Sequence, residues 1–237
     1  MQAKYKRILL KLSGEMLCSA GGCAIEPAAI DNVISEIAGV TALGVEVAVV
    51  VGGGNFLRGR DLSGNPRIQR TTADYMGMLA TIMNALALRD SMASHGLKAD
   101  VLSPISDPRV CEPFTQQRAN ELLSRGHVVI LAGGTGSPFF TTDTGAALRA
   151  SEIGACVLVK ATKVDGVFDS DPVKNPSARK YDELTYQKVL ADRLGVMDLT
   201  AISFCMENRM PVVVFALANP GSLVKVICGQ SIGTMVR

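Results

Sequence analysis

The sequence predicts an α/β fold, a three-layer sandwich in which helices cover both faces of a mainly parallel sheet. Short apolar runs alternate with amphipathic stretches along the 237 residues, which is typical of repeated βαβ units. The run at residues 45–51 is apolar at nearly every position, as expected for a parallel strand that is buried on both faces. No repeat, linker or low-complexity tract interrupts this pattern, so the chain is expected to form one domain.

The spacing of apolar residues places the individual elements. A first strand is predicted at residues 8–12, and Pro27 then opens a helix that runs to residue 43 and ends at Gly44. The remaining elements continue the alternation, with strands at 45–51, 99–102, 128–131, 157–159, 212–215 and 234–236, helices at 73–94, 115–124, 144–153, 185–190 and 198–207, and a last helix after Pro220.

The region after residue 159 departs from that alternation. Residues 163–168 are expected to form a strand–turn–strand unit, because Asp165 and Gly166 supply turn chemistry. The pairs Asp171-Pro172 and Asn175-Pro176 then predict an irregular loop. The C-terminal third is thus expected to form a lobe of the same domain.

The composition narrows the function. Hydrophobic residues make up 48% of the sequence, which excludes disordered and fibrous classes. No apolar run reaches the roughly 18–20 residues of a membrane span, and Lys11 interrupts the apolar stretch after Arg7, so a cytosolic protein without a secretory signal is predicted. The net charge is +2 with scattered basic residues, so nucleic acid is not expected as a main partner. Six cysteines without a CxxC pair, and only two histidines, disfavour a zinc site.

Three predicted strand ends combine glycine with basic or polar residues. The first strand runs into Lys11-Leu12-Ser13-Gly14, the second into Gly52-Gly53-Gly54-Asn55 with Arg58 beyond, and the strand at 128–131 into Gly133–Pro138 followed by Thr141-Thr142-Asp143. Glycine lets backbone N–H groups approach a phosphate without a Cβ in the way. Because ligands of open parallel sheets bind beyond the carboxyl ends of the strands, the three loops together predict a phosphate-binding edge.

Other common motifs do not fit the spacing. No lysine stands in the frame of a Walker A loop, and a dinucleotide fingerprint would need glycine where Leu57 and Phe139 stand. The sequence also lacks a nucleophile elbow and the protein-kinase motif set. These nucleotide-binding and hydrolase classes are therefore excluded.

Several longer segments carry a family resemblance. They are Lys6–Glu15, Gly52–Asn55 with Arg58-Gly59, Asp74–Thr81, Gly134–Asp143, Lys160–Phe168 with Asp171-Pro172, and Val196-Met197-Asp198. In this order they resemble the amino acid kinase superfamily, and the match is most specific to its UMP kinase branch. The resemblance covers nearly the whole chain, from about residue 6 to the end. It implies an amino acid kinase-like fold and transfer of the γ-phosphoryl group of ATP to UMP.

The resemblance implies a role for each matched segment. On the ATP side, which is centred on residues 156–237, it implies contacts to the phosphates from Lys11, Leu12, Ser13, Gly14, Gly54 and Arg58, and to adenine and ribose from Thr162, Phe168 and Asp171. On the UMP side, residues 1–155, it implies that Asp74 contacts the ribose. It implies that the other contacts to UMP come from Gly53, Thr135, Gly136, Ser137, Pro138, Phe139, Phe140, Thr141 and Thr142. Lys11, Arg58, Asp143 and Asp198 are the implied catalytic residues, the two aspartates organising Mg²⁺ and the reacting phosphates.

Further properties are implied by the resemblance alone. They are a Mg²⁺ cofactor held mainly through nucleotide phosphates, with Asp143 as the candidate protein ligand, a homohexamer, inhibition by UTP, and in most members activation by GTP. The sequence departs from the family pattern at Cys156, which replaces a common aspartate, and at Cys23, which replaces an aromatic residue. The segment 93–100 also does not match the pattern of basic and histidine residues seen in GTP-activated members, although Arg89 remains. These departures weaken the expectation of GTP activation more than that of UMP phosphorylation.

The residue types suit transfer to a phosphate acceptor. The phosphate of UMP is mostly dianionic near neutral pH, because its second pKa is about 6, so it needs no general base. The obstacle is charge repulsion, since unit charges about 4 Å apart repel by roughly 4 kcal/mol at an effective dielectric constant of 20. Lys11, Arg58 and Mg²⁺ are the expected counter-charges.

Other readings of these residues stay open. Asp74 could cap or decorate the helix after Thr71-Thr72, Asp143 could be a first-turn acid, and Asp198 could be an N-cap. Two rival functions are another amino acid kinase that acts on a carboxylate or carbamate, and a non-catalytic nucleotide-binding or storage protein on the same fold. Asp74 in its segment, and a chain too short for a regulatory domain, disfavour the first rival.

Overall fold

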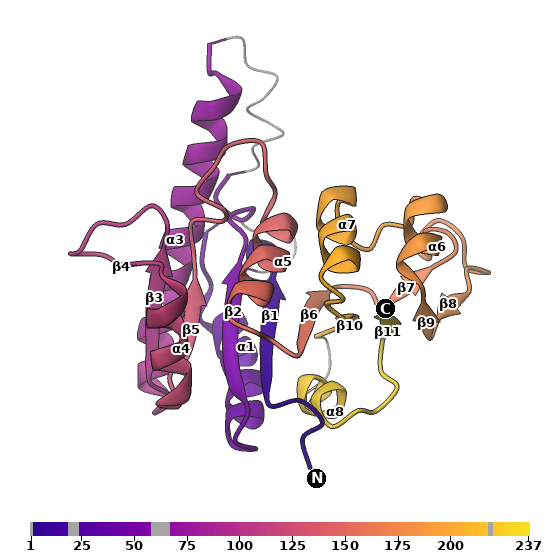
Figure 1. Cartoon of the computed structure of the whole chain (residues 1–237), viewed down its shortest axis with the longest axis horizontal. Helices are drawn as coiled ribbons and strands as arrows, with labels where there is room; N and C mark the ends of the chain where they lie inside the picture. Colours follow the sequence, from indigo (N-terminus) through magenta and orange to yellow (C-terminus); the bar gives the residue numbers. More distant parts are fainter. Residues whose placement is uncertain (1, 19–23, 58–66, 218–219) are drawn as a thin grey trace.

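The structure, a computed structural model, describes residues 2–18, 24–57, 67–217 and 220–237. Its strands are β1 (Arg7–Leu12), β2 (Glu46–Val51), β3 (Ala99–Ser103), β4 (Glu112–Pro113), β5 (Val128–Leu131), β6 (Val157–Thr162), β7 (Val167–Phe168), β8 (Lys180–Tyr181), β9 (Glu183–Leu184), β10 (Val212–Ala216) and β11 (Thr234–Val236). Nine of them form one sheet in the order β4-β3-β5-β2-β1-β6-β10-β11-β9 (Figure 1). Within it the described neighbours pair in parallel except β10 and β11, so the sheet is mainly parallel as predicted.

Helices cover both faces of the sheet and complete the predicted three-layer sandwich. They are α1 (Pro27–Thr41), α3 (Arg70–Ser94), α4 (Gln116–Ser124), α5 (Thr142–Glu152), α6 (Tyr186–Ala191), α7 (Leu199–Glu207) and α8 (Ser222–Ile227). Side chains of α1, α3 and α8 pack in one hydrophobic cluster with Ile8 and Leu10 of β1, whereas those of α4 to α7 pack in a second cluster with Leu9. Successive residues of a strand point to opposite faces, so β1 is buried by both layers.

The strand–turn–strand unit expected at residues 163–168 does not form. The chain bends after β6, and β7 pairs antiparallel with β8 in a separate two-stranded sheet. The N–H of Val167 donates to Oγ1 of Thr234 at 2.8 Å. Gly166 has a φ of +125°, and a Cβ at this position would lie 2.6 Å from the same oxygen. The glycine thus brings the chain against β11 instead of closing a local hairpin.

Other differences concern the ends of elements. Helix α3 begins at Arg70 and not at residue 73, and β6 continues to Thr162, beyond the predicted end at residue 159. The two-residue strands β4 and β9 and the 3₁₀ turn η1 (Gly14–Leu17) were not predicted. Elements this short contain too few residues to show a period in their apolar positions.

The ends of β1, β2 and β5 lie side by side at one edge of the sheet. Lys11 of β1 is in register with Val50 of β2, which is in register with Leu131 of β5. The three glycine-containing loops therefore leave from adjacent strands, and the prediction of a common edge is confirmed. Helix α3 runs past this edge, and its N-terminal turns project beyond the body of the protein (Figure 1).

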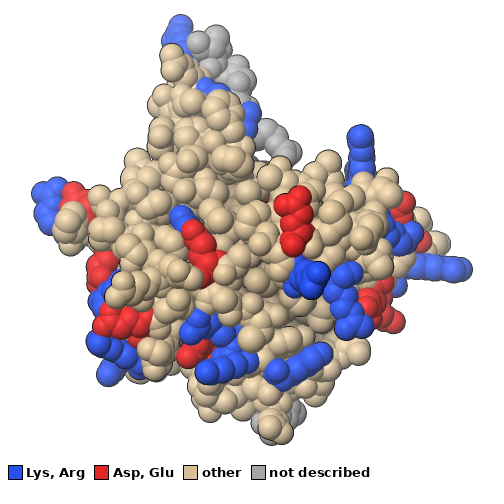
Figure 2. Space-filling view, viewed as in Figure 1, with Lys and Arg blue, Asp and Glu red and all other residues tan. Residues whose placement is uncertain are grey.

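The surface gives no sign of a polyanion-binding face on the side that Figure 2 shows. Acidic and basic side chains are interspersed there over the described residues, without a broad basic patch. In the described part of the chain, no helix combines the length and the apolar character that a membrane crossing requires.

Candidate active site

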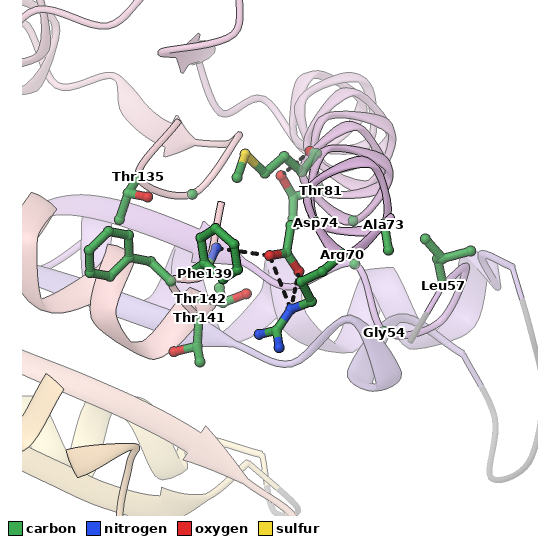
Figure 3. Close-up of a pocket in the computed structure, with 15 residues that line it drawn as sticks. Gly54, Leu57, Arg70, Ala73, Asp74, Thr81, Thr135, Phe139, Thr141 and Thr142 are labelled. Carbon is green, nitrogen blue, oxygen red and sulfur yellow. Dashed lines mark hydrogen bonds and ion pairs between the residues drawn. The ribbon is translucent and has the colours of Figure 1, made fainter. Parts of the chain in front are cut away.

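A cavity of about 430 Å³ opens at this edge, between α3 and the loop that follows β5. Figure 3 shows Asp74 and Arg70 on α3 facing Phe139 and Thr141 of that loop. Among the residues expected to hold UMP, the lining includes Gly53, Asp74, Thr135, Phe139, Phe140, Thr141 and Thr142. Gly136, Ser137 and Pro138 belong to the same loop but do not line the cavity. Most of the expected UMP residues are thus brought together.

Asp74 is fixed at the cavity wall by two neighbours. The N–H of Phe139 donates to Asp74 Oδ2 at 2.8 Å, and Arg70 Nε lies 3.3 Å from the same oxygen (Figure 3). The N-cap residue of α3 is Gln69, so Asp74 does not cap the helix. A carboxylate can accept about four hydrogen bonds, so Asp74 retains the capacity to bind a ligand hydroxyl.

Arg70 is a cavity residue that the sequence reasoning missed. Its guanidinium lies over the Phe139 ring, 5.5 Å from the ring centre, and Phe139 has a φ of +72° that only a firmly held non-glycine residue adopts. The spacing of four residues between Arg70 and Asp74 was the available signal, since such residues meet on one helix face. This spacing was overlooked because the helix was predicted to begin at residue 73, after Arg70.

Helix α3 also holds two of the glycine loops. A Cβ on Gly53 would lie 2.8 Å from the Cβ of Ala80, so the loop after β2 can approach the helix this closely only with glycine. The N–H of Gly133, after β5, donates to Oγ1 of Thr81 at 2.7 Å. Both loops are therefore positioned by one rigid element, which is how a precise site is best supported.

A buried pair of amides fixes the loop after β2. Asn84 Nδ2 donates to the carbonyl of Gly52 and to Asn55 Oδ1, both at 2.7 Å. Asn55 Nδ2 returns a bond to Asn84 Oδ1 at 3.0 Å and donates to the carbonyl of Ala24 at 2.8 Å. Asn84 is fully buried and out of reach of water, so its polar atoms depend on these hydrogen bonds.

Replacing Asn84 with leucine is expected to lower the free energy of unfolding by about 1–3 kcal/mol, because the Gly52 carbonyl and the Asn55 amide lose buried partners. Urea unfolding measures the difference. The control is Asn32→Leu on the exposed face of α1, for which a change within about 0.5 kcal/mol is expected. Equal effects of the two substitutions would contradict a supporting role for the amide pair.

A buried ion cluster lies at the tips of β1 and β6. Lys11 Nζ lies 2.8 Å from Asp143 Oδ1, and Lys160 Nζ lies 2.9 Å from Asp143 Oδ2. Burial acts to raise the pKa of the Asp143 carboxyl, but the two lysines outweigh burial and hold that pKa below its ordinary value. Asp143 also stands in the first turn of α5, where a negative charge is favourable, so it has the structural role considered for it as well.

Lys160 was assigned no role from the sequence. Its ammonium donates to the carbonyl of Val196 at 2.6 Å in addition to Asp143, and burial lowers its pKa. The predicted end of the strand at residue 159 placed this lysine in a loop. Its register with Lys11 on the neighbouring strand, which brings both ammonium groups to one carboxylate, becomes visible only in the folded sheet.

Asp198 lies beside the cluster and is the N-cap of α7, as the structural reading proposed. The N–H of Ala201 donates to Asp198 Oδ1 at 3.0 Å. The hydroxyl of Thr144 donates to the same carboxylate at 3.1 Å, and the Thr141 hydroxyl makes a further, short hydrogen bond to it. Thr141 is itself the N-cap of α5 and lines the cavity. Asp198 thus joins α7 to the cavity loop and to the helix that carries Asp143.

The residues expected to contact adenine and ribose lie apart from this cavity. Thr162 ends β6 and donates to a backbone carbonyl of β10 at 3.2 Å. Phe168 is half-buried in β7, and Asp171 accepts a backbone N–H at 3.0 Å inside its own loop. Thr162 ends β6 and the other two residues follow that strand, and none of the three lines the cavity beside α3. The residues expected on the ATP side are therefore separate from the cavity residues expected on the UMP side.

The expected phosphate contacts lie nearer the cavity. A Cβ on Gly14 would lie 2.6 Å from the carbonyl of Gly52, so the loops after β1 and β2 touch, and Gly54 of the second loop lines the cavity. Ser13 caps η1, and the Leu12 side chain is buried in the core, so only the backbone of Leu12 can face a ligand. Arg58 and Cys23 fall outside the residues that the structure describes.

Cys156 lies far from this edge. It is exposed and immediately precedes β6, at the opposite end of the strand from Lys160 and Thr162. The aspartate that the family commonly has at this position would therefore stand away from the ion cluster. The substitution leaves the charges of the site unchanged.

Comparison with known proteins identifies the family. The model of the amino acid kinase family matches residues 6–216. The chain is 51% identical over 233 residues to uridylate kinase PUMPKIN, chloroplastic, of Arabidopsis thaliana, an alignment that covers 98% of this chain and 69% of that protein. Solved structures of the UMP kinases of Bacillus anthracis and Ureaplasma parvum superpose with TM-scores of 0.95 and 0.91, at 37% and 34% identity, over 98% of this chain and 96% and 99% of theirs. The chain belongs to the amino acid kinase family and is similar to the uridylate kinases of that family over nearly its whole length.

Proposed function

We propose that the protein is a UMP kinase that transfers the γ-phosphoryl group of ATP to UMP, giving UDP and ADP. The observation that carries the proposal is that a cavity with a carboxylate at its wall ends beside a buried cluster with two lysines. Its volume of about 430 Å³ lies in the range common for small-molecule sites. Thr141 connects the two parts, since it lines the cavity and caps the helix that carries Asp143.

In the proposed complex, UMP occupies the cavity. The Asp74 carboxylate accepts hydrogen bonds from the ribose hydroxyls, and Arg70 and Phe139 hold that carboxylate in place. The phosphate lies toward the threonines and the glycine loops, with the N-terminus of α5 providing a favourable dipole. The expected UMP-side residues are Gly53, Asp74, Thr135, Gly136, Ser137, Pro138, Phe139, Phe140, Thr141 and Thr142.

ATP approaches the ion cluster from the opposite side. Its phosphates lie over the backbone of residues 12–14, with Lys11, Gly54 and Arg58, and its adenosine lies against Thr162, Phe168 and Asp171. The single domain then has a UMP side in residues 1–155 and an ATP side in residues 156–237. The two phosphate chains meet above the tips of β1 and β6, where Lys11 and Asp143 lie.

The chemistry required of the protein is positioning and charge compensation. The acceptor oxygen of UMP belongs to a phosphate that is already deprotonated, so no side chain has to remove a proton. Lys11, at the end of a buried strand, places a positive charge where the γ-phosphoryl group is transferred. Asp143 and Asp198 orient that lysine and the cavity loop through the contacts described above.

Mg²⁺ is expected to accompany ATP. Asp143 Oδ1 is buried and forms an ion pair with Lys11 Nζ at 2.8 Å, but among the described residues it accepts no further hydrogen bond. No group of three or more His, Cys, Asp or Glu side chains in the described part of the chain could hold a metal ion. Since Mg²⁺ usually keeps several waters and binds through one or two carboxylates plus substrate phosphates, these residues fit an ion held mainly by the nucleotide, with Asp143 as its carboxylate. When bound, the ion would offset the charge of the phosphates.

A homohexamer is also part of the proposal. Helix α3 exposes a row of large apolar side chains, with Tyr75, Leu79 and Met83 each 45% to 51% exposed. Met76, at 38%, extends the same row. Exposed apolar rows of this kind are typical of surfaces that pack against another subunit. The cytosolic location remains a prediction, and the Arabidopsis relative is named as chloroplastic.

The proposal includes two nucleotide effectors, UTP and GTP. UTP is proposed as an inhibitor that competes for the nucleotide sites. A second cavity of about 470 Å³ is lined by two basic residues, Arg89 and Lys98, and by two acidic ones, Asp90 and Asp100; Asp100 lies 2.6 Å from His127 Nδ1. The two carboxylates offset the two cations, so this cavity gives no specific support for a triphosphate, and GTP stays a candidate activator.

The proposal is tested by turnover. Purified protein with Mg²⁺, ATP and UMP is expected to release ADP and UDP, measured by a coupled assay and by separation of the nucleotides. Absence of product at high enzyme concentration would reject the kinase and favour a nucleotide-binding or storage protein. Repeating the assay with UTP and GTP measures both effector responses.

Ligand protection separates the kinase from the other rival. UMP is expected to raise the thermal unfolding midpoint, because a ligand that binds only the folded state stabilises it, by about 2.7 kcal/mol at a hundredfold excess over Kd. Aspartate, glutamate and carbamate are expected to leave the midpoint unchanged. Protection by one of these instead of UMP would assign the chain to an amino acid kinase of different specificity.

A further inference from the structure

Two lysines on neighbouring strands share one buried carboxylate. Lys11 of β1 and Lys160 of β6 are in register, so their side chains leave the sheet on the same face. Their ammonium groups lie 2.8 Å and 2.9 Å from the two oxygens of Asp143. The three side chains are only 13% to 15% exposed, so water screens their charges weakly.

The charges of this cluster depend on Lys160. Lys11 and Asp143 alone would form a neutral pair, whereas the three residues together carry one net positive charge. Asp198, a further carboxylate that acts on Lys160, makes the group of four neutral, and without Lys160 this group would carry one net negative charge. Positive charge attracts an approaching polyanion. Without a second lysine, Asp143 would neutralise Lys11, so Lys11 would attract the polyanion less.

We propose that Lys160 is a positioning residue for phosphoryl transfer, which offsets the charge of Asp143 and so leaves Lys11 available to the phosphates. It binds Asp143 Oδ2, which leaves Oδ1 of that carboxylate to Lys11. Its bond to the Val196 carbonyl fixes the ammonium from the other side. This inference rests on the proposed kinase activity.

A purely structural ion pair explains the arrangement less well. Burying an ammonium group costs several kcal/mol, and apolar replacements of buried ion pairs are often neutral or stabilising. Packing alone would therefore favour an apolar residue at position 160, on a strand whose preceding residues Val157, Leu158 and Val159 are all fully buried. A charge at this position is better explained by the net charge it gives the site.

The first test removes the charge and keeps the hydrogen bonding. In Lys160→Gln the amide can still donate to Asp143, so a role limited to structure predicts nearly normal kcat. We expect kcat to fall about 100-fold, while KM for UMP stays within about twofold because the cavity is untouched. The control is Lys188→Gln on α6, which removes an exposed lysine paired with Asp192 at 2.7 Å and should leave both constants unchanged.

The second test is a double-substitution cycle with Asp143. Asp143→Asn leaves two unneutralised lysines, and Lys160→Gln leaves a neutral Lys11–Asp143 pair, but the double variant again carries one net positive charge. We expect its kcat to exceed, by about tenfold or more, the value obtained by multiplying the two single losses. Multiplicative losses would overturn the proposal, because independent roles predict them.

The outcomes separate this inference from the kinase assignment. An inactive wild-type protein would refute the assignment itself. An active wild type with a normal Lys160→Gln kcat, or a loss confined to KM, would refute only the role of Lys160. If the glutamine variant unfolds, Lys160→Met, which fits the apolar surroundings, takes its place with the same expected losses, and thermal unfolding identifies which variant is folded.

Discussion

Replacing Lys11 with alanine is expected to lower kcat by about a thousandfold while the fold stays intact. The lysine lies at the tip of a buried strand, where its charge acts with little screening on the transferred phosphoryl group. Removing one such preorganised group typically costs a factor of about 10²–10³. Steady-state kinetics with varied ATP and UMP measure the loss, and thermal unfolding reports the fold.

Lys6→Ala provides the matched control for this prediction. Lys6 is exposed and precedes the same strand at its opposite end, so its removal should leave kcat unchanged. A Lys11 variant that retains most of its kcat would contradict the placement of this lysine at the reacting phosphates. Unfolding of the Lys11 variant alone would instead indicate a structural role for the ion pair with Asp143.

Replacing Asp74 with asparagine is expected to raise KM for UMP about 10- to 100-fold and to change KM for ATP less than about twofold. A hydrogen bond to a charged group contributes about 1.5–3 kcal/mol, and the substitution removes the charge that the ribose hydroxyls would meet. The amide oxygen can still accept from the N–H of Phe139, so the cavity should keep its shape.

Asp107→Asn is the control for Asp74, because Asp107 is an exposed carboxylate in a loop away from the cavity, paired with Arg109 at 2.7 Å. It should leave both Michaelis constants unchanged. An equal rise in the two constants of the Asp74 variant would contradict its assignment to UMP. A fall in kcat alone would point to a role in the chemical step.

The layers of the fold and the edge that carries the site were predictable from local patterns. The apolar run of β2 shows burial on both faces, and the glycines after β1, β2 and β5 mark the places where the backbone must approach a ligand or another loop closely. Parallel pairing then brings these loops together without further information. Asp74 and most of the threonine loop could be placed at one cavity for the same reason.

The ion cluster and the cavity supports were not predictable in this way. Lys160 reaches Asp143 only because β6 lies beside β1, a neighbour distant in sequence. Asn84 and Thr81 look like ordinary polar positions of a helix until the loops are placed against them. The pairing of β7 with β8 was missed because each strand has only two residues, too few to show a period. The contact of β7 with Thr234 was missed because Thr234 is distant in sequence.

A crystal structure with UMP and a non-hydrolysable ATP analogue tests the central claim most directly. Uridine is expected beside Asp74 and the adenine near Thr162, and the two phosphate chains are expected to face each other above Lys11 at the tips of β1 and β6. Nucleotides bound away from this edge, or phosphates without contact to Lys11, would contradict it.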